Sequence, residues 1–202
     1  MAGPDEYGAL LLDYAVGSVT PAASLLVETH LRLKPGSGAA VAALDAAGGA
    51  LLEAIVPTPM AALPLTVTEE PRGAPPARAP LLDARALIEA ASRAPDGLHW
   101  RWRAPALREL RLPVEGASLI RLAGGRAIPA HSHTGDEITL VLRGAYADQA
   151  GRYTVGDIAF AGPDVDHSPQ VPPGEDCVCL VAMSGTLRFH GAMARIAARL
   201  MA

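Results

Sequence analysis

Two histidines and a glutamate lie close together in the sequence, and a further histidine follows them. His131 and His133 are separated by one residue, so in a β-strand both side chains point to the same face. A short turn would bring Glu137 beside them, and His167 follows a predicted hairpin turn from which it could reach the same point. Neutral imidazoles and a carboxylate bind borderline divalent metals. The spacing therefore predicts one divalent metal per chain, held by His131, His133, Glu137 and His167.

The sequence indicates the ligand residues more clearly than it indicates which metal they bind. Three imidazoles and one carboxylate can hold zinc, iron, manganese, nickel or copper, and zinc is the metal that we expect. Four protein ligands close the tetrahedral shell of zinc, whereas iron or manganese would keep open positions for dioxygen or substrate. Arg126, Asp136 and Asp166 flank the ligands and are candidates for orienting the imidazoles.

The two halves of the chain differ in the pattern of their apolar residues. The first half predicts helices, and their expected ranges are 8–17, 20–33, 38–55 and, after a proline-rich stretch at 57–80, 81–94. From residue 98 onward, short segments of alternating polarity are separated by Gly, Pro and Asp, as is typical of an all-β sandwich or barrel. The predicted fold class is α+β with two domains, a small N-terminal helical bundle and a C-terminal barrel.

The composition limits the classes of partner. The 202 residues suit one large or two small domains, and a net charge of -4 gives no case for nucleic acid or an anionic membrane as partner. The N-terminus is acidic, unlike a secretion signal, and the apolar stretch 39–57 is interrupted by Asp45 and Glu53. We therefore expect a cytoplasmic protein without a membrane span.

The predicted ligands belong to two motifs that resemble those of the cupin family. The first motif, G-x5-H-x-H-x3-E-x6-G, is matched at every named position, by Gly125, His131, His133, Glu137 and Gly144. The second keeps Gly156 and His167, whereas its proline comes one residue late, at Pro163, and Gln170 replaces an Asn. The resemblance implies a double-stranded β-helix, or jelly-roll, barrel with one metal.

The whole chain resembles a narrower family, the ChrR-type anti-sigma factors. The similar segments are residues 9–33 and 43–53 in the helices and 131–148, 156–161 and 176–182 in the cupin. The resemblance implies three parts: an anti-sigma-like helical domain at 1–72, a proline-rich linker and helix at 73–95, and a cupin domain at 96–202. It also implies that the helices sequester an extracytoplasmic-function sigma factor and that the metal-binding cupin senses oxidative stress or a ligand.

One motif of this family is incomplete here. The family's helices carry a zinc motif, H-x3-C-x2-C, with another histidine near the start of the chain. His30 is kept, but Lys34 and Ser37 stand at the cysteine positions, and the upstream position falls near Asp5 or Glu6. Because one imidazole and a carboxylate cannot build a structural zinc site, we expect no zinc in the N-terminal domain. We expect His30 at the helix surface or in an interface, and sigma-factor binding without the cysteines stays an open question.

The sequence leaves open the role of the two cysteines and the choice between a regulator and an enzyme. Cys177 and Cys179 are the only cysteines and would face one side of a strand. We interpret them as small apolar core residues, with a redox sensor near the metal as the alternative. For the whole chain, the alternative to a regulator is a dioxygenase-like cupin metalloenzyme whose helices form a homodimer. No separate nucleophile or general base is identifiable, and the regulator that the resemblance implies is the preferred interpretation.

Overall fold

The computed structural model describes residues 4–57, 84–92, 100–104 and 106–189. Within these ranges the helices are α1 (Pro4–Ala15), α2 (Pro21–Leu33), the 3-10 turn η1 (Pro35–Ser37), α3 (Gly38–Glu53) and α4 (Ala84–Ser92). The predicted proline-rich stretch and most of the predicted linker lie outside the described residues. None of the helices described is long and apolar enough to cross a membrane.

The start of α2 follows from its sequence. Thr20 is in an extended conformation, and its side chain accepts a hydrogen bond from the backbone N–H of Ala23 at 3.2 Å. Pro21 occupies the first helical position, where the missing N–H costs nothing and the fixed φ suits a helix. The predicted N-cap is therefore confirmed.

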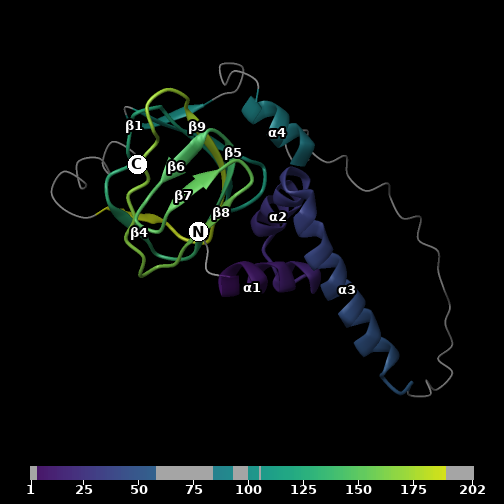
Figure 1. The fold of residues 1–202 in the computed structure, drawn as a ribbon. Helices are drawn as coiled ribbons and strands as arrows, with labels where there is room; N and C mark the ends of the chain where they lie inside the picture. Colours follow the sequence, from purple (N-terminus) through teal and green to yellow (C-terminus); the bar gives the residue numbers. More distant parts are fainter. Residues whose placement is uncertain (1–3, 58–83, 93–99, 105, 190–202) are drawn as a thin grey trace, which may run out of the picture.

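The described residues of the second half form three antiparallel sheets. The strands are β1 (Arg101–Ala104), β2 (Leu107–Arg111), β3 (Ala117–Leu122), β4 (His131–His133), β5 (Glu137–Arg143), β6 (Ala145–Ala147), β7 (Arg152–Thr154), β8 (Ile158–Ala161), β9 (Cys177–Met183) and β10 (Leu187–Phe189). A six-stranded sheet has the order β1-β2-β3-β9-β5-β8, and two small sheets pair β10 with β4 and β6 with β7. Together they form the barrel seen in Figure 1, as the predicted fold class required.

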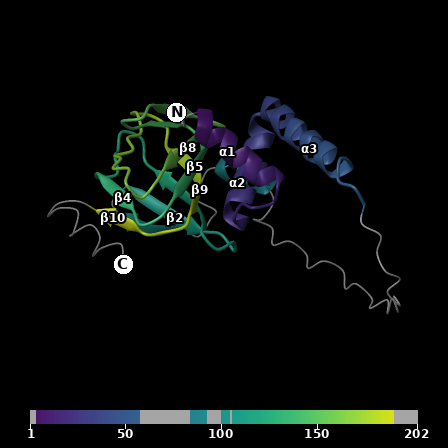
Figure 2. The same ribbon diagram turned by 90° about the horizontal axis from the view of Figure 1, so that it is seen from below.

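The large sheet is buried on both faces. Its inner face carries Val141 and packs with Tyr146 and Tyr153 inside the barrel. Its outer face carries Leu140, which belongs to the same apolar cluster as Leu26 of α2. Because neighbouring strand residues point to opposite faces, β5 contributes to both cores. The helices and the barrel therefore share one hydrophobic core on the outer side of the sheet, and Figures 1 and 2 show α2 beside the barrel.

α3 is packed differently from the other helices. Val41 and Leu44, near its start, are half-buried against the outer core, whereas every residue of 45–57 is exposed. Both views show α3 running away from the barrel. The apolar side chains at its far end, Leu51 and Leu52, are each 71% exposed. This half of α3 therefore presents an exposed apolar surface.

Candidate metal centre

Backbone pairing brings the three predicted histidine ligands together. β4 holds His131 and His133 and pairs with β10. His131 and His167 form a two-way backbone bridge, in which each N–H donates to the other residue's carbonyl at 3.1 and 3.0 Å. All three side chains are buried. The strand pairing thus places the imidazole of His167 beside those of His131 and His133, although it comes from a later part of the sequence.

The nitrogen atoms converge at metal-ligand distances. One ligand nitrogen from each of the three rings lies within 4.8 Å of the others. The Nε2 atoms of His133 and His167 are 3.0 Å apart. Two nitrogens that bind one zinc ion at about 2.0–2.1 Å lie roughly 3 to 3.4 Å from each other. The three histidines can therefore hold a metal ion.

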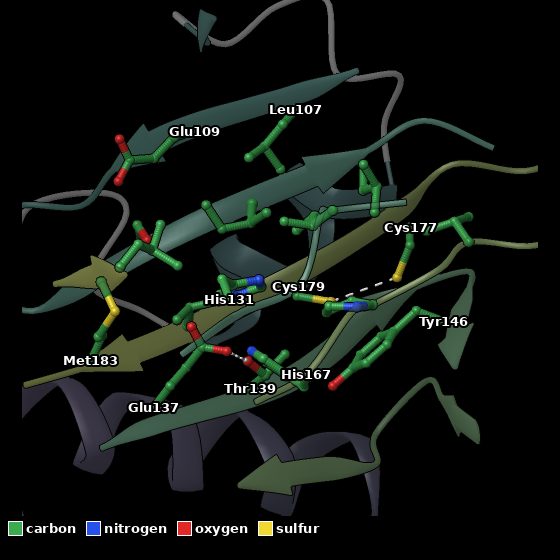
Figure 3. Close-up of a pocket in the computed structure, with 18 residues that line it drawn as sticks. Leu107, Glu109, His131, Glu137, Thr139, Tyr146, His167, Cys177, Cys179 and Met183 are labelled. Carbon is green, nitrogen blue, oxygen red and sulfur yellow. Dashed lines mark hydrogen bonds between the residues drawn. The ribbon is translucent and has the colours of Figure 1, made fainter. Parts of the chain in front are cut away.

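Glu137, the fourth predicted ligand, begins β5 beside the histidines. Its Oε2 atom lies 3.6 Å from the Nε2 atom of His133, and its Oε1 atom accepts a hydrogen bond from the Thr139 hydroxyl at 3.1 Å. Figure 3 shows the carboxylate pointing toward the same space as His131 and His167. Burial raises the pKa of Glu137 to about 7, because few neighbours compensate its negative charge. A divalent cation would supply that compensation.

Burial favours the neutral forms of His133 and His167. Burial, followed by the electrostatic effect of His131 and His167, lowers the pKa of His133 to about 4. Burial also lowers the pKa of His167, against the opposing effect of the Asp148 carboxylate. Because a metal binds the unprotonated nitrogen, these shifts keep the lone pairs available.

Two neighbouring groups orient the rings. His131 Nδ1 donates to the carbonyl oxygen of Pro129 at 2.9 Å, which places the lone pair of the neutral ring on Nε2. The Oδ2 atom of Asp148, a buried side chain, lies 3.7 Å from His167 Nδ1, and its negative charge favours the tautomer with hydrogen on Nδ1. Sequence reasoning proposed three other residues for this role and missed Asp148. Its position three residues before Gly151, between two short strands, is a turn signal, but that signal does not say which histidine the carboxylate faces.

A cavity of about 110 Å³ lies next to these ligands. Most of its lining is apolar, and its polar lining includes His131, Glu137, His167 and the thiols of Cys177 and Cys179 (Figure 3). The two sulfur atoms are 3.6 Å apart, and both cysteines belong to the inner core. The hydrogen bond from Cys177 and burial raise the pKa of the Cys179 thiol. The cysteines are therefore buried core residues that also face the cavity.

The helical histidine has a different environment. His30 is buried at the contact between α2 and the barrel, where its Nδ1 atom lies 2.8 Å from the carbonyl oxygen of Gly156. Of the two expected positions, the interface is confirmed and the helix surface is wrong. The neighbouring positions, Lys34 and Ser37, contact Asp157 and His30 respectively.

A jelly-roll barrel with three converging histidines, packed against N-terminal helices, defines a cupin with a helical extension. Residues 95–186 match the ChrR Cupin-like domain family. The chain is 36% identical over 197 residues to the anti-sigma-E factor ChrR of Cereibacter sphaeroides, covering 93% of this chain and 92% of that protein. The crystal structure of Rhodobacter sphaeroides SigE in complex with the anti-sigma ChrR matches with a TM-score of 0.68 and 36% identity, over 88% of this chain and 96% of that chain. The chain therefore belongs to the ChrR family of anti-sigma factors.

Proposed function

We propose that this protein is a cytoplasmic anti-sigma factor that sequesters an extracytoplasmic-function sigma factor through its N-terminal helices. The observation that carries the proposal is the exposed half of α3. The relative whose crystal structure matches is an anti-sigma factor in complex with SigE, and the match covers 88% of this chain. A sigma factor is thus the occupant that we propose for the apolar surface of α3.

The surface of α3 suits a helical partner. Leu51 and Leu52 at its far end, and Ile55 and Val56 just beyond it, are all more than half exposed. Gly48 and Gly49 have no neighbouring atoms within 4 Å of where a Cβ would stand. Glycines let another backbone approach closely, and contiguous exposed apolar side chains mark interaction surfaces. The paired glycines therefore support close packing of a sigma-factor helix on this segment.

The barrel would hold one divalent metal through His131, His133, Glu137 and His167. The converging nitrogens, the orienting carbonyl and carboxylate, and the buried Glu137 support this ligand set. Three imidazoles and one carboxylate suit zinc first, with iron, manganese or nickel as alternatives. We propose no zinc in the helices, since no thiolate stands near His30 among the described residues.

We propose that the barrel acts as the sensor. The cavity beside the metal ligands gives a small oxidant or ligand a place next to Glu137 and the two thiols. Signal binding there would weaken sigma-factor binding only if the two states of the barrel hold the helices differently. The shared core of helices and sheet supports such a connection.

The test is binding to the sigma factor of the same organism, measured by calorimetry with the full chain. Leu51→Asp with Leu52→Asp puts two charges on the α3 surface and should weaken binding at least about a hundredfold, since removing interface anchors costs more than roughly 2 kcal/mol. Val165→Asp changes an apolar residue of the barrel that is exposed to 45% and should leave the affinity unchanged. Equal affinities for the wild type and both variants would contradict the assignment of α3 to the interface.

A further inference from the structure

The His30 ring connects four separate segments of the chain. Its Nδ1 atom lies 2.8 Å from the carbonyl oxygen of Gly156 in the turn between β7 and β8. A carbonyl can only accept, so Nδ1 carries the hydrogen and Nε2 of the neutral ring is an acceptor. Nε2 lies 2.8 Å from the Tyr7 hydroxyl of α1 and 3.1 Å from the Ser37 hydroxyl of η1. One side chain of α2 thus holds α1, η1 and the barrel together.

Lys34 makes a second contact to the same turn. It is the only lysine of the chain, and its Nζ atom lies 3.5 Å from Asp157 Oδ1. Its aliphatic stem crosses Gly156, where an added Cβ would lie 2.5 Å from Lys34 Cε and 2.9 Å from Cγ. Gly156 also has a φ of +87°, which favours glycine. The turn is therefore shaped to accept the lysine stem.

These contacts join the helical segments to one another and to the barrel. Lys34 contacts Asp157, and Ser37 contacts His30. Hydrogen bonds and an ion pair need no ion and add a connection to the barrel. We call this set, Tyr7, His30, Lys34 and Ser37 with the turn residues Gly156 and Asp157, the clasp.

The turn in the clasp is bonded directly to the strand that carries Glu137. Gly156 N–H donates to the Val141 carbonyl at 2.8 Å, and Val141 N–H donates to the Asp157 carbonyl at 3.1 Å. β8, which follows the turn, pairs with β5 so that Ala161 lies opposite Glu137. One strand pair therefore has the metal ligand at one end and the clasp at the other.

We propose that the clasp transmits the metal state of the barrel to α2, so that metal binding at Glu137 orders the helices through β5, β8 and the turn. This inference rests on the proposed metal site. It requires that ordering of β5 by a bound cation reduces local opening of the turn and, through His30, of α2. In this proposal, one hydrogen bond, from His30 Nδ1 to the Gly156 carbonyl, connects the β7–β8 turn to α2.

Two conservative substitutions of His30 separate its contact with the barrel from its contacts with α1 and η1. The amide nitrogen of Asn occupies about the place of a histidine Nδ1, and that of Gln about the place of Nε2. His30→Asn therefore keeps the donor to the Gly156 carbonyl and loses the contacts with Tyr7 and Ser37. His30→Gln loses the donor to Gly156 and keeps the contacts with the two hydroxyls, which rotate to accept from the amide N–H groups. Hydrogen–deuterium exchange of residues 24–37 is measured in the full chain with and without zinc, alongside zinc stoichiometry.

In the wild type and in His30→Asn, zinc should slow exchange of residues 24–37 by roughly threefold or more, as local opening becomes rarer. In His30→Gln, zinc should bind with the same stoichiometry and leave this exchange unchanged. Zinc binding without slowing in the wild type, or equal slowing in His30→Gln, would overturn the clasp while leaving the metal site intact. No zinc uptake in the wild type would remove the metal site and this inference with it.

Discussion

The Nε2 atom of His133 lies 3.0 Å from the Nε2 atom of His167, with both rings buried. In a metal-free protein one of these nitrogens must donate a hydrogen to the other, whereas a metal ion beside both accepts their two lone pairs. Because burial lowers the pKa of both rings, the neutral forms that a metal needs are already favoured. At neutral pH the two rings can therefore bind a cation without first losing a proton.

The first prediction concerns metal content. The protein purified without added metal should contain one divalent metal per chain, and the variant with His131→Ala and His133→Ala should contain none, because it loses two of four ligands. Elemental mass spectrometry of both proteins measures this. Two zinc ions per wild-type chain would contradict the assignment of a metal-free clasp around His30, and no metal in the wild type would contradict the barrel site.

The second prediction is a pH-dependent proton release on metal binding. With a pKa of about 7, the metal-free Glu137 is mostly protonated at pH 6 and mostly ionised at pH 8. The carboxylate form binds the metal, so zinc uptake should release close to one proton at pH 6 and much less at pH 8. Calorimetry in buffers of different ionisation enthalpy gives the number of protons. A release that is equal at both pH values would show that Glu137 is not the titrating ligand.

The position of His131 and His133 on one strand could be predicted from the sequence because its signal is local. The alternation of His131 and His133 places both rings on one strand face, and Glu137 follows after a short turn. The start of α2 is equally local, because Thr20 and Pro21 determine it within one helical turn. Such features depend on neighbours in sequence, and the fold does not change them.

The contacts between distant residues could not be predicted in this way. His30 and Gly156 are 126 positions apart, and their hydrogen bond exists only because α2 packs on the outer face of the large sheet. The approach of Asp148 to His167 likewise depends on how the β6–β7 hairpin docks on the barrel. Periodicity identifies which face of an element is buried, but it does not identify the residue on the other side.

The third prediction concerns the ring orientation of His167. Asp148→Asn keeps an oxygen for the N–H groups of Ala150 and Gly151 but can replace the second oxygen, which faces His167 Nδ1, by an amide donor. A donor there disfavours the Nδ1–H tautomer and turns Nε2 into the protonated atom. Zinc affinity should fall by roughly 10–100-fold, as for other orienting carboxylates. Competition with a chromogenic chelator measures the affinity, and an unchanged value would rule out the orienting role.

The fourth prediction tests whether the helices and the barrel unfold together. Leu26 of α2 is fully buried in the core that also contains Leu119, Leu140 and Leu180 of the sheet. Leu26→Ala should therefore lower the free energy of unfolding by roughly 2–5 kcal/mol, and the loss should appear in one transition for the whole chain.

The control is Leu51→Ala, at a position exposed to 71%, which should change the free energy of unfolding by less than about 0.5 kcal/mol. Chemical denaturation is followed by circular dichroism, which reports mainly on the helices, and by the fluorescence of Trp102 in β1 in a Trp100→Phe background, because Trp100 packs on the core shared with the helices. Two separate transitions, with only the circular-dichroism one moved by Leu26→Ala, would mean that the helices fold independently of the barrel.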